Sequence, residues 1–265
     1  MRLALVRKTI RDRWKNLLGW SLAMFALTSI QLYIYPTIEK TADAMDQFIK
    51  AFPKELIAMF RIEDYTSATG FLGTELFSMM IPLVFIAIGS SWAASAAAEE
   101  EERGTSEIIY ALPISRTSVL LSKVVAAWLI LVAITALEFV ILSIGSPLVG
   151  LDLEGVELIP GLASCLGLGM FFHGLALLLG SITGKRGVAL GAAIGIGLIS
   201  FLVFSLAPLV DTFDSVLPFI PFEWALGNSP LTDGFDWLGL TFLLSGTVLT
   251  TLASLVAINS RDLDA

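Results

Sequence analysis

Residues 71–116 read FLGTELFSMMIPLVFIAIGSSWAASAAAEEEERGTSEIIYALPISR, an apolar run followed by four consecutive glutamates and a short polar loop. The apolar part, residues 71–96, is long enough at about 1.5 Å per residue to cross a hydrocarbon layer about 30 Å thick. Similar runs recur along the chain, so we expect six transmembrane helices. The predicted spans are residues 17–36, 71–96, 117–145, 159–182, 187–209 and 237–258.

The overall composition agrees with a membrane protein. The 265 residues are 56% hydrophobic and only 15% charged, which leaves too few charges for the surface of a water-soluble domain. We therefore expect an all-α membrane protein in which residues 1–265 form a single transmembrane domain. The chain has one cysteine, Cys165, and one histidine, His173, which excludes an intrachain disulfide, a zinc cluster and a histidine-rich metal site. Scattered basic residues and a net charge of −8 argue against nucleic acid as a partner.

The distribution of Lys and Arg predicts the orientation. The first, third, fifth and seventh non-spanning segments carry 12 of the 16 basic residues, whereas the second carries four and the other two carry none. Because basic loops are retained in the cytoplasm, we expect both termini to be cytoplasmic. The chain would then be a multi-pass protein of the plasma (cell) membrane, and we expect a prokaryotic source.

Two segments outside the spans are amphipathic. Apolar residues recur at helical spacing before the first span, which is typical of a helix in the headgroup layer, with membrane lipid as its partner. This stretch is either a positively charged flank or an elbow helix that also touches a cytoplasmic partner. Residues 37–69 are too charged to span, and we expect short outer helices broken at Pro53. The apolar stripe of the first stretch is Leu3, Val6, Ile10, Trp14 and Leu17.

The loop at residues 99–116 has its own local pattern. We expect the preceding helix to end before Gly104 and a second helix of about two turns to follow, capped by Thr105 or Ser106. Pro113 would stop this short helix. Ser115 would then cap the third span, with Lys123 at the cytoplasmic end of that span.

This loop resembles the first cytoplasmic loop of permease subunits of the ABC-2 family of ATP-binding-cassette transporters, which reads E-x-x-x-G-T-x-E, a short apolar stretch, L-P-x-S-R and a later Lys. Ser106 departs from the pattern, since other members often carry a bulky aliphatic residue there. The matching residues are Glu100, Gly104, Thr105, Glu107, Leu112, Pro113, Ser115, Arg116 and Lys123.

The resemblance implies that the short helix is a coupling helix, which docks on a cytoplasmic ATP-binding-cassette ATPase subunit. It also implies a second permease subunit, as a homodimer or a related heterodimer. We call residues 99–116 the coupling segment. The candidate coupling residues are Glu100, Glu101, Glu102, Arg103, Gly104, Thr105, Glu107, Ile108, Tyr110, Leu112, Pro113, Ser115, Arg116 and Lys123.

The chain offers no ATP site of its own in sequence. The nearest approach to a phosphate loop, GSITGKR at residues 180–186, has three residues between the glycines and lacks the Ser or Thr after Lys. We interpret it as a tight turn between two spans. The chain is therefore expected to have no catalytic residue, metal or cofactor, and ATP and Mg²⁺ would bind to the partner ATPase.

The four glutamates at residues 99–102 should be compensated by basic groups, because carboxylates at a helix C-terminus face the negative end of its dipole. Glu99 can pair with Arg103 four residues on. The other carboxylates would meet the basic first helix or arginines on a partner, or they form a solvated helix tip.

Three ionisable groups fall inside predicted spans and are functional candidates, since burying them is costly. Glu75 either reaches the outer headgroups or has a function. Glu138 lines a substrate path, joins a subunit interface or bonds to Ser or Thr on another helix. His173 is expected to donate to a nearby carbonyl group.

Three glycines open the fifth span at a spacing of four, at Gly187, Gly191 and Gly195. Such a face lets another helix approach closely. We expect tight packing within one subunit, with a dimer face as the alternative.

The expected function is that of a permease subunit of an exporter for a hydrophobic or amphipathic substrate, such as a drug, lipid or peptide. One alternative is an ion-coupled secondary transporter that uses Glu138, Glu75 and His173, and it predicts two related halves. A second alternative is a membrane anchor that recruits an ATPase without moving a substrate.

Overall fold

In a computed structural model, residues 3–62, 64–102, 104 and 114–260 are described, and their regular secondary structure is helical. Six helical segments in this part of the chain are long and apolar enough to cross a membrane, which confirms the expected number of transmembrane helices. The segments are α2 (Trp14–Lys40), the continuous segment Ala68–Glu102, α8 (Arg116–Leu148), α9 (Leu158–Thr183), Arg186–Leu209 and α12 (Trp237–Ser260).

The second and fifth spans are composite. The second consists of α5 (Ala68–Leu72), a π-helical turn η1 (Gly73–Met80) and α6 (Ile81–Glu102). Pro82 has no N–H to donate to the preceding turn, which provides a local reason for the wider π-helical winding before it. The fifth span is α10 (Arg186–Leu206) extended by a single 3₁₀ turn, η2 (Ala207–Leu209).

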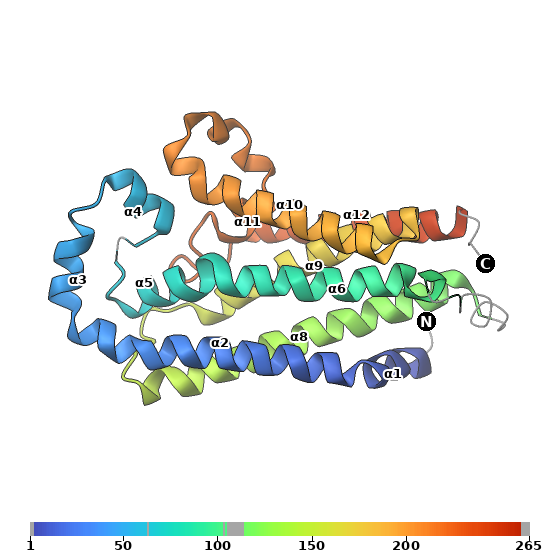
Figure 1. The fold of residues 1–265 in the computed structure, drawn as a ribbon, viewed down its shortest axis with the longest axis horizontal. Helices are drawn as coiled ribbons and strands as arrows, with labels where there is room; N and C mark the ends of the chain where they lie inside the picture. Colours follow the sequence, from blue (N-terminus) through green and yellow to red (C-terminus); the bar gives the residue numbers. More distant parts are fainter. Residues whose placement is uncertain (1–2, 63, 103, 105–113, 261–265) are drawn as a thin grey trace.

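The shorter helices lie at the two ends of the bundle (Figure 1). α1 (Leu3–Asp12) lies at the end where α6 and α12 finish and α8 begins. α3 (Ala42–Ile49) and α4 (Lys54–Phe60) lie at the opposite end, and Pro53 precedes α4, as the sequence predicts. The chain between α10 and α12 forms short turns in place of one long helix. These turns are η3 (Asp211–Ser215), η4 (Leu217–Phe219) and α11 (Pro221–Leu226).

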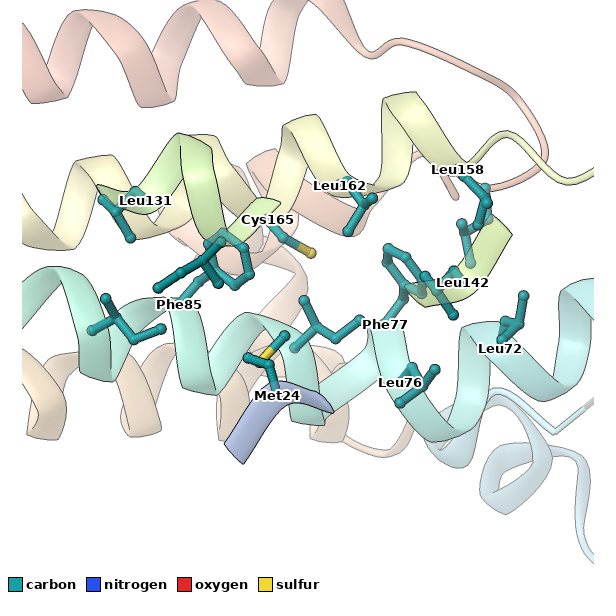
Figure 2. Packing of buried hydrophobic residues seen from close by; sticks show 14 of the residues in the cluster. Met24, Leu72, Leu76, Phe77, Phe85, Leu131, Leu142, Leu158, Leu162 and Cys165 are labelled. Atoms are coloured by element: carbon teal, nitrogen blue, oxygen red, sulfur yellow. The ribbon is translucent and has the colours of Figure 1, made fainter. Parts of the chain in front are cut away.

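α9 occupies the centre of the bundle and packs against α6, α10 and α12. Glycines bring α6 close to α9: a Cβ at Gly89 of α6 would lie only 2.3 Å from the carbonyl oxygen of Gly169 of α9. Figure 2 shows side chains from several helices meeting in the core, among them Met24, Phe85 and Cys165, all fully buried. α9 therefore connects α6 with both α10 and α12.

The predicted packing of the fifth-span glycines within one chain is wrong. A Cβ at Gly187, Gly191 or Gly195 would meet nothing within 4 Å among the described residues. Neighbouring apolar residues on the same helix, including Val188 and Ile199, are also exposed. The alternative, that this face meets a second subunit, stays a prediction.

Candidate functional site

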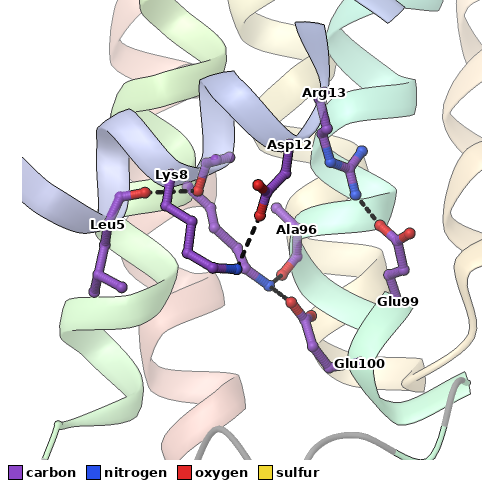
Figure 3. Close-up of polar contacts among 9 residues, drawn as sticks. Leu5, Lys8, Asp12, Arg13, Ala96, Glu99 and Glu100 are labelled. Carbon is purple, nitrogen blue, oxygen red and sulfur yellow. Dashed lines mark hydrogen bonds and ion pairs between the residues drawn. The ribbon is translucent and has the colours of Figure 1, made fainter. Parts of the chain in front are cut away.

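The C-terminal tip of α6 carries four glutamates, Glu99 to Glu102, where the helix dipole is unfavourable for negative charge. Glu99 forms an ion pair with Arg13, which lies at the junction of α1 and α2 (Figure 3). The Arg13 guanidinium also lies 5.4 Å from the centre of the Trp92 ring, within the range of a cation–π contact. The sequence assigned the basic N-terminal region to the other carboxylates, but in the structure it is Glu99 that pairs with it, through Arg13. Arg13 ties the start of α2 to the end of α6.

Glu100 forms a second ion pair, with Lys123 of α8. The Lys123 ammonium group also donates to the backbone carbonyl of Ala96, at 3.0 Å. The side chains of Lys123 and Glu100 are only 15% and 24% exposed, so this pair is mostly shielded from solvent. These contacts join the last turns of α6 to the second turn of α8.

Glu102 makes a third link, by accepting a hydrogen bond from the backbone N–H of Arg186 at 2.7 Å. Arg186 is the first residue of α10, where the positive end of the helix dipole favours a carboxylate. The expected pair of Glu99 with Arg103 stays a prediction, because Arg103 lies outside the described residues. The tip of α6 is thus connected to α2, α8 and α10.

α1 packs against α8 beside this tip. Within α1, Lys8 and Asp12 form an exposed ion pair at 2.9 Å, and the hydrogen bond from Lys8 holds the pKa of Asp12 below its usual value. Within the predicted apolar stripe, Val6 is buried, whereas Leu3 is exposed at the start of the helix. Its place at the end of the bundle suits a helix in the headgroup layer.

Both ends of the coupling segment that the structure describes have the expected geometry. Gly104 has a φ of +63°, a left-handed conformation that ends a helix and that glycine adopts without strain. At the other end, the Ser115 hydroxyl accepts from the Ser118 N–H at 3.2 Å and caps α8. Arg116 donates to the carbonyl of Ile258 at 3.3 Å, near the end of α12. The candidates Arg103, Thr105, Glu107, Ile108, Tyr110, Leu112 and Pro113 lie outside the described residues.

Glu138 lies inside the bundle and is fully buried. Its Oε1 accepts a hydrogen bond of 2.5 Å from the Thr28 hydroxyl of α2, which is one of the three arrangements considered from the sequence. Its Oε2 has no hydrogen-bond partner in the part of the chain that the structure describes. The sequence analysis did not identify Thr28. Thr28 and Gln31 are polar residues three apart within an apolar run, and this helical spacing could have indicated a polar contact on one face of α2.

Glu75 lies at the π-helical turn η1 and has two partners. Tyr65 donates to it at 2.6 Å and Gln31 of α2 donates at 3.1 Å. Burial, together with the hydrogen bond to Glu75, raises the pKa of the Tyr65 hydroxyl above its usual value. Glu75 therefore holds α2 and the segment before α5 together at the end of the bundle that carries α3 and α4.

The expectation for His173 is wrong. The ring is fully buried, and neither nitrogen has a hydrogen-bond partner among the described residues. The neighbouring group is the Trp128 ring, whose centre lies 6.4 Å away in an edge-on arrangement. No three His, Cys, Asp or Glu side chains come together as a metal site in the described ranges.

Arg61 fixes the opposite end of the molecule. It has a φ of +53°, unusual for a residue other than glycine. Its guanidinium donates to the carbonyl of Leu226 at 3.1 Å and lies 4.3 Å from the centre of the Phe204 ring. Burial raises the pKa of nearby Glu223, an effect that the charge of Arg61 partly opposes. These contacts join α4 to α10 and α11 beside a pocket of about 560 Å³.

Comparison with known proteins identifies the family of this bundle. A model of the family described as ABC-2 family transporter protein matches residues 3–262, nearly the whole chain. A search of curated proteins found no match to the chain. Permeases of the matched family are the membrane subunits of transporters, have no ATP site of their own and typically work with ATP-binding subunits. With its six membrane-spanning helices and a match over nearly its full length, the chain belongs to the ABC-2 transporter family as a transport permease.

Proposed function

We propose that the chain is the permease subunit of an ATP-driven exporter that moves a hydrophobic or amphipathic substrate, such as a drug, a lipid or a peptide. Separate ATPase subunits bind ATP and Mg²⁺ and dock on the coupling segment, residues 99–116. Two permease subunits, identical or related, form the membrane part of the complex. The end of the bundle that carries α1 and the coupling segment faces the cytoplasm, and both termini lie on that side.

The observation that carries this proposal is that both ends of the coupling segment are fixed to the bundle by ion pairs and a helix cap. It leaves α6 beside Glu99 and Glu100, which pair with Arg13 and Lys123, and it enters α8 at the capped Ser115. A force applied to the segment therefore acts on α6, α8 and the start of α2 together. Without these ties, the end of α6 would bend and absorb the motion.

Through its packing, α6 would pass a movement of the coupling segment on to other helices. α6 packs along the central helix α9 and also against α10. α9 and α10 in turn contact α11, away from the coupling segment. At the Gly89–Gly169 contact the two helices pack closely without intervening side chains, so we expect α6 and α9 to move together. ATP binding can shift the bundle between two states only if the ATPase binds the coupling segment with a different free energy in each state.

The interior supports an apolar or amphipathic substrate. Among the described residues, the fully buried ionisable side chains in the bundle are Glu138, His173 and Cys165, and the other buried groups are apolar or small and polar. A strongly charged solute would need several fixed counter-charges along its path. The apolar surfaces of α10 and α12 also suit a substrate that enters from the lipid phase.

The proposal is tested by purifying the tagged chain from native membranes, identifying an associated ATPase by mass spectrometry and reconstituting both in proteoliposomes. We expect ATP hydrolysis that increases when transported apolar compounds are added. Glu107→Arg in the coupling segment should abolish association, whereas the matched reversal Glu154→Arg in the loop before α9 should preserve it. If no ATPase is recovered, the proposal is wrong. Association and hydrolysis without substrate movement would favour a membrane anchor.

A further inference from the structure

A second pocket, of about 620 Å³, opens at the end of the bundle that carries α1. Its walls come from α1, the start of α2, the last turns of α6, and the starts of α8 and α10. Figure 3 shows part of this wall, where Arg13 at the junction of α1 and α2 points toward Glu99 of α6. The proposed function assigns this pocket no ligand.

The pocket has an excess of positive charge. Its basic residues outnumber its acidic ones by five to three, and each acidic residue already has a basic partner. The two remaining cations are Lys15 of α2 and Arg186 of α10, whose side chains form no ion pair with other described residues. The paired residues are Lys8 with Asp12, Arg13 with Glu99, and Lys123 with Glu100.

An apolar surface begins directly beside the pocket. On the outward side of α2, within the two turns after Lys15, Leu18 and Leu22 are 55% and 68% exposed, and Trp14 is 51% exposed at the start of the helix. Large exposed apolar side chains on a membrane-spanning helix face lipid chains, and a tryptophan at the start of a span suits the headgroup level. A ligand of this region therefore meets cations at one end and an apolar helix face at the other.

We propose that this pocket binds the headgroup of an anionic phospholipid, with its phosphate held by Lys15 and Arg186 and its acyl chains along the outward face of α2. Basic pockets between spanning helices at a membrane surface bind anionic headgroups by this charge complementarity. The existing ion pairs offset the charges of Glu99 and Glu100, and the carboxylate of Glu102 is bound by the backbone N–H at the start of α10. Free inorganic phosphate presents the same charge, but it makes no use of the apolar face.

The bound lipid would lie against the roots of the coupling segment. Its headgroup contacts the same junction of α1, α6 and α8 that holds Glu99 and Glu100, so that lipid composition can affect how firmly these helices are joined. The inference rests on the membrane placement of the proposed function, but it does not require an ATPase. Lipid binding is measured on the permease alone, and its failure would leave the ATPase proposal standing.

The test uses the purified full-length chain without an ATPase, delipidated in neutral detergent. Short-chain phosphatidylglycerol, phosphatidylcholine and inorganic phosphate are titrated separately, and bound ligand is counted by native mass spectrometry. The variant is Lys15→Gln with Arg186→Gln. Its matched control is Lys50→Gln with Lys54→Gln, which removes the same charge at the opposite end of the bundle. Gel filtration checks that each variant is folded.

We expect the wild-type chain to bind phosphatidylglycerol at least about tenfold more tightly than phosphatidylcholine, and the Lys15–Arg186 variant to lose roughly that preference. The control variant should behave as wild type. Equal binding of the two lipids by the wild-type chain overturns the proposal, even if the variant does not fold. Inorganic phosphate that binds as tightly as phosphatidylglycerol also overturns it, because the acyl chains would then contribute nothing.

Discussion

The ion pair between Glu100 and Lys123 gives a prediction whose magnitude follows from its surroundings. The change is Glu100→Gln, which removes the negative charge and keeps the size of the side chain. Lys123 would then retain the carbonyl of Ala96 as a partner but would lose its counter-charge. Removing one partner of a fully buried pair costs about 3–5 kcal/mol. An exposed pair contributes only about 0–1 kcal/mol.

The observed pair lies between these limits. The Lys123 and Glu100 side chains are 15% and 24% exposed, so water reaches part of the pair. We therefore expect Glu100→Gln to lower the free energy of unfolding by about 2 kcal/mol, a change of about 30-fold in the equilibrium constant. Lys123→Met should cost a similar amount, because it leaves the carboxylate of Glu100 without that cation.

A double-mutant cycle isolates the pair from the separate effects of each side chain. The wild-type chain, both single variants and the double variant are unfolded reversibly in mixed micelles by increasing SDS, followed by tryptophan fluorescence. The double variant should lose about 1–2 kcal/mol less than the sum of the single variants. The exposed pair Lys8–Asp12 is the matched control, with an expected coupling of about 0.3–0.5 kcal/mol.

Additive single effects, within about 0.5 kcal/mol, would refute the reasoning. They would mean that Glu100 and Lys123 do not join α6 to α8 energetically. In that case the coupling segment would be rooted by Ser115 and the pair of Glu99 with Arg13, and the proposed transmission through α8 would lose its main support.

Two further predictions concern the interior and are measured in the same unfolding assay. Thr28→Val should destabilise the bundle by about 1–3 kcal/mol, since it leaves the buried Glu138 without its hydrogen bond. Thr135→Val, whose hydroxyl bonds only within its own helix, should cost less than about 0.5 kcal/mol, and equal effects would contradict this role of Thr28. Gly89→Ala should prevent normal packing of α6 on α9, because its Cβ would lie 2.3 Å from backbone, whereas Gly19→Ala has open space and should be tolerated. A Gly89→Ala variant as stable as Gly19→Ala would show that the helices can separate at little cost.

The spans could be predicted from the sequence because each is decided by local composition. An apolar run of sufficient length has to be helical in lipid, since its backbone groups have no other partners. The caps and breaks at Ser115, Pro53 and Gly104 were also predictable, since they depend on the residue itself. The same reasoning did not identify the π-helical turn, although Pro82 provides a reason for it.

For contacts between distant parts of the chain, the sequence predicted the type of partner but not which residue it would be. The glutamates of α6 required basic partners, but nothing in the sequence selects Arg13 or Lys123 among the cations near that end. For the fifth-span glycines, a packing partner within the chain was predicted and none was found, because small residues permit close packing without specifying which helix packs against them. For His173, the expected carbonyl partner is missing among the described residues, and the neighbouring group is the Trp128 ring, which the sequence does not single out.

The central claim is that an ATPase docks on the coupling segment, and site-specific crosslinking tests it most directly. Cys165 is buried, and replacing it with serine gives a cysteine-free chain in which single cysteines are placed at Ile108 or, as a control, at Glu154. In native membranes, a short bifunctional reagent should join position 108 to an ATP-binding-cassette ATPase, with a yield that changes when ATP is added. Crosslinking from position 108 to no ATPase, or equally well from position 154, would contradict the account.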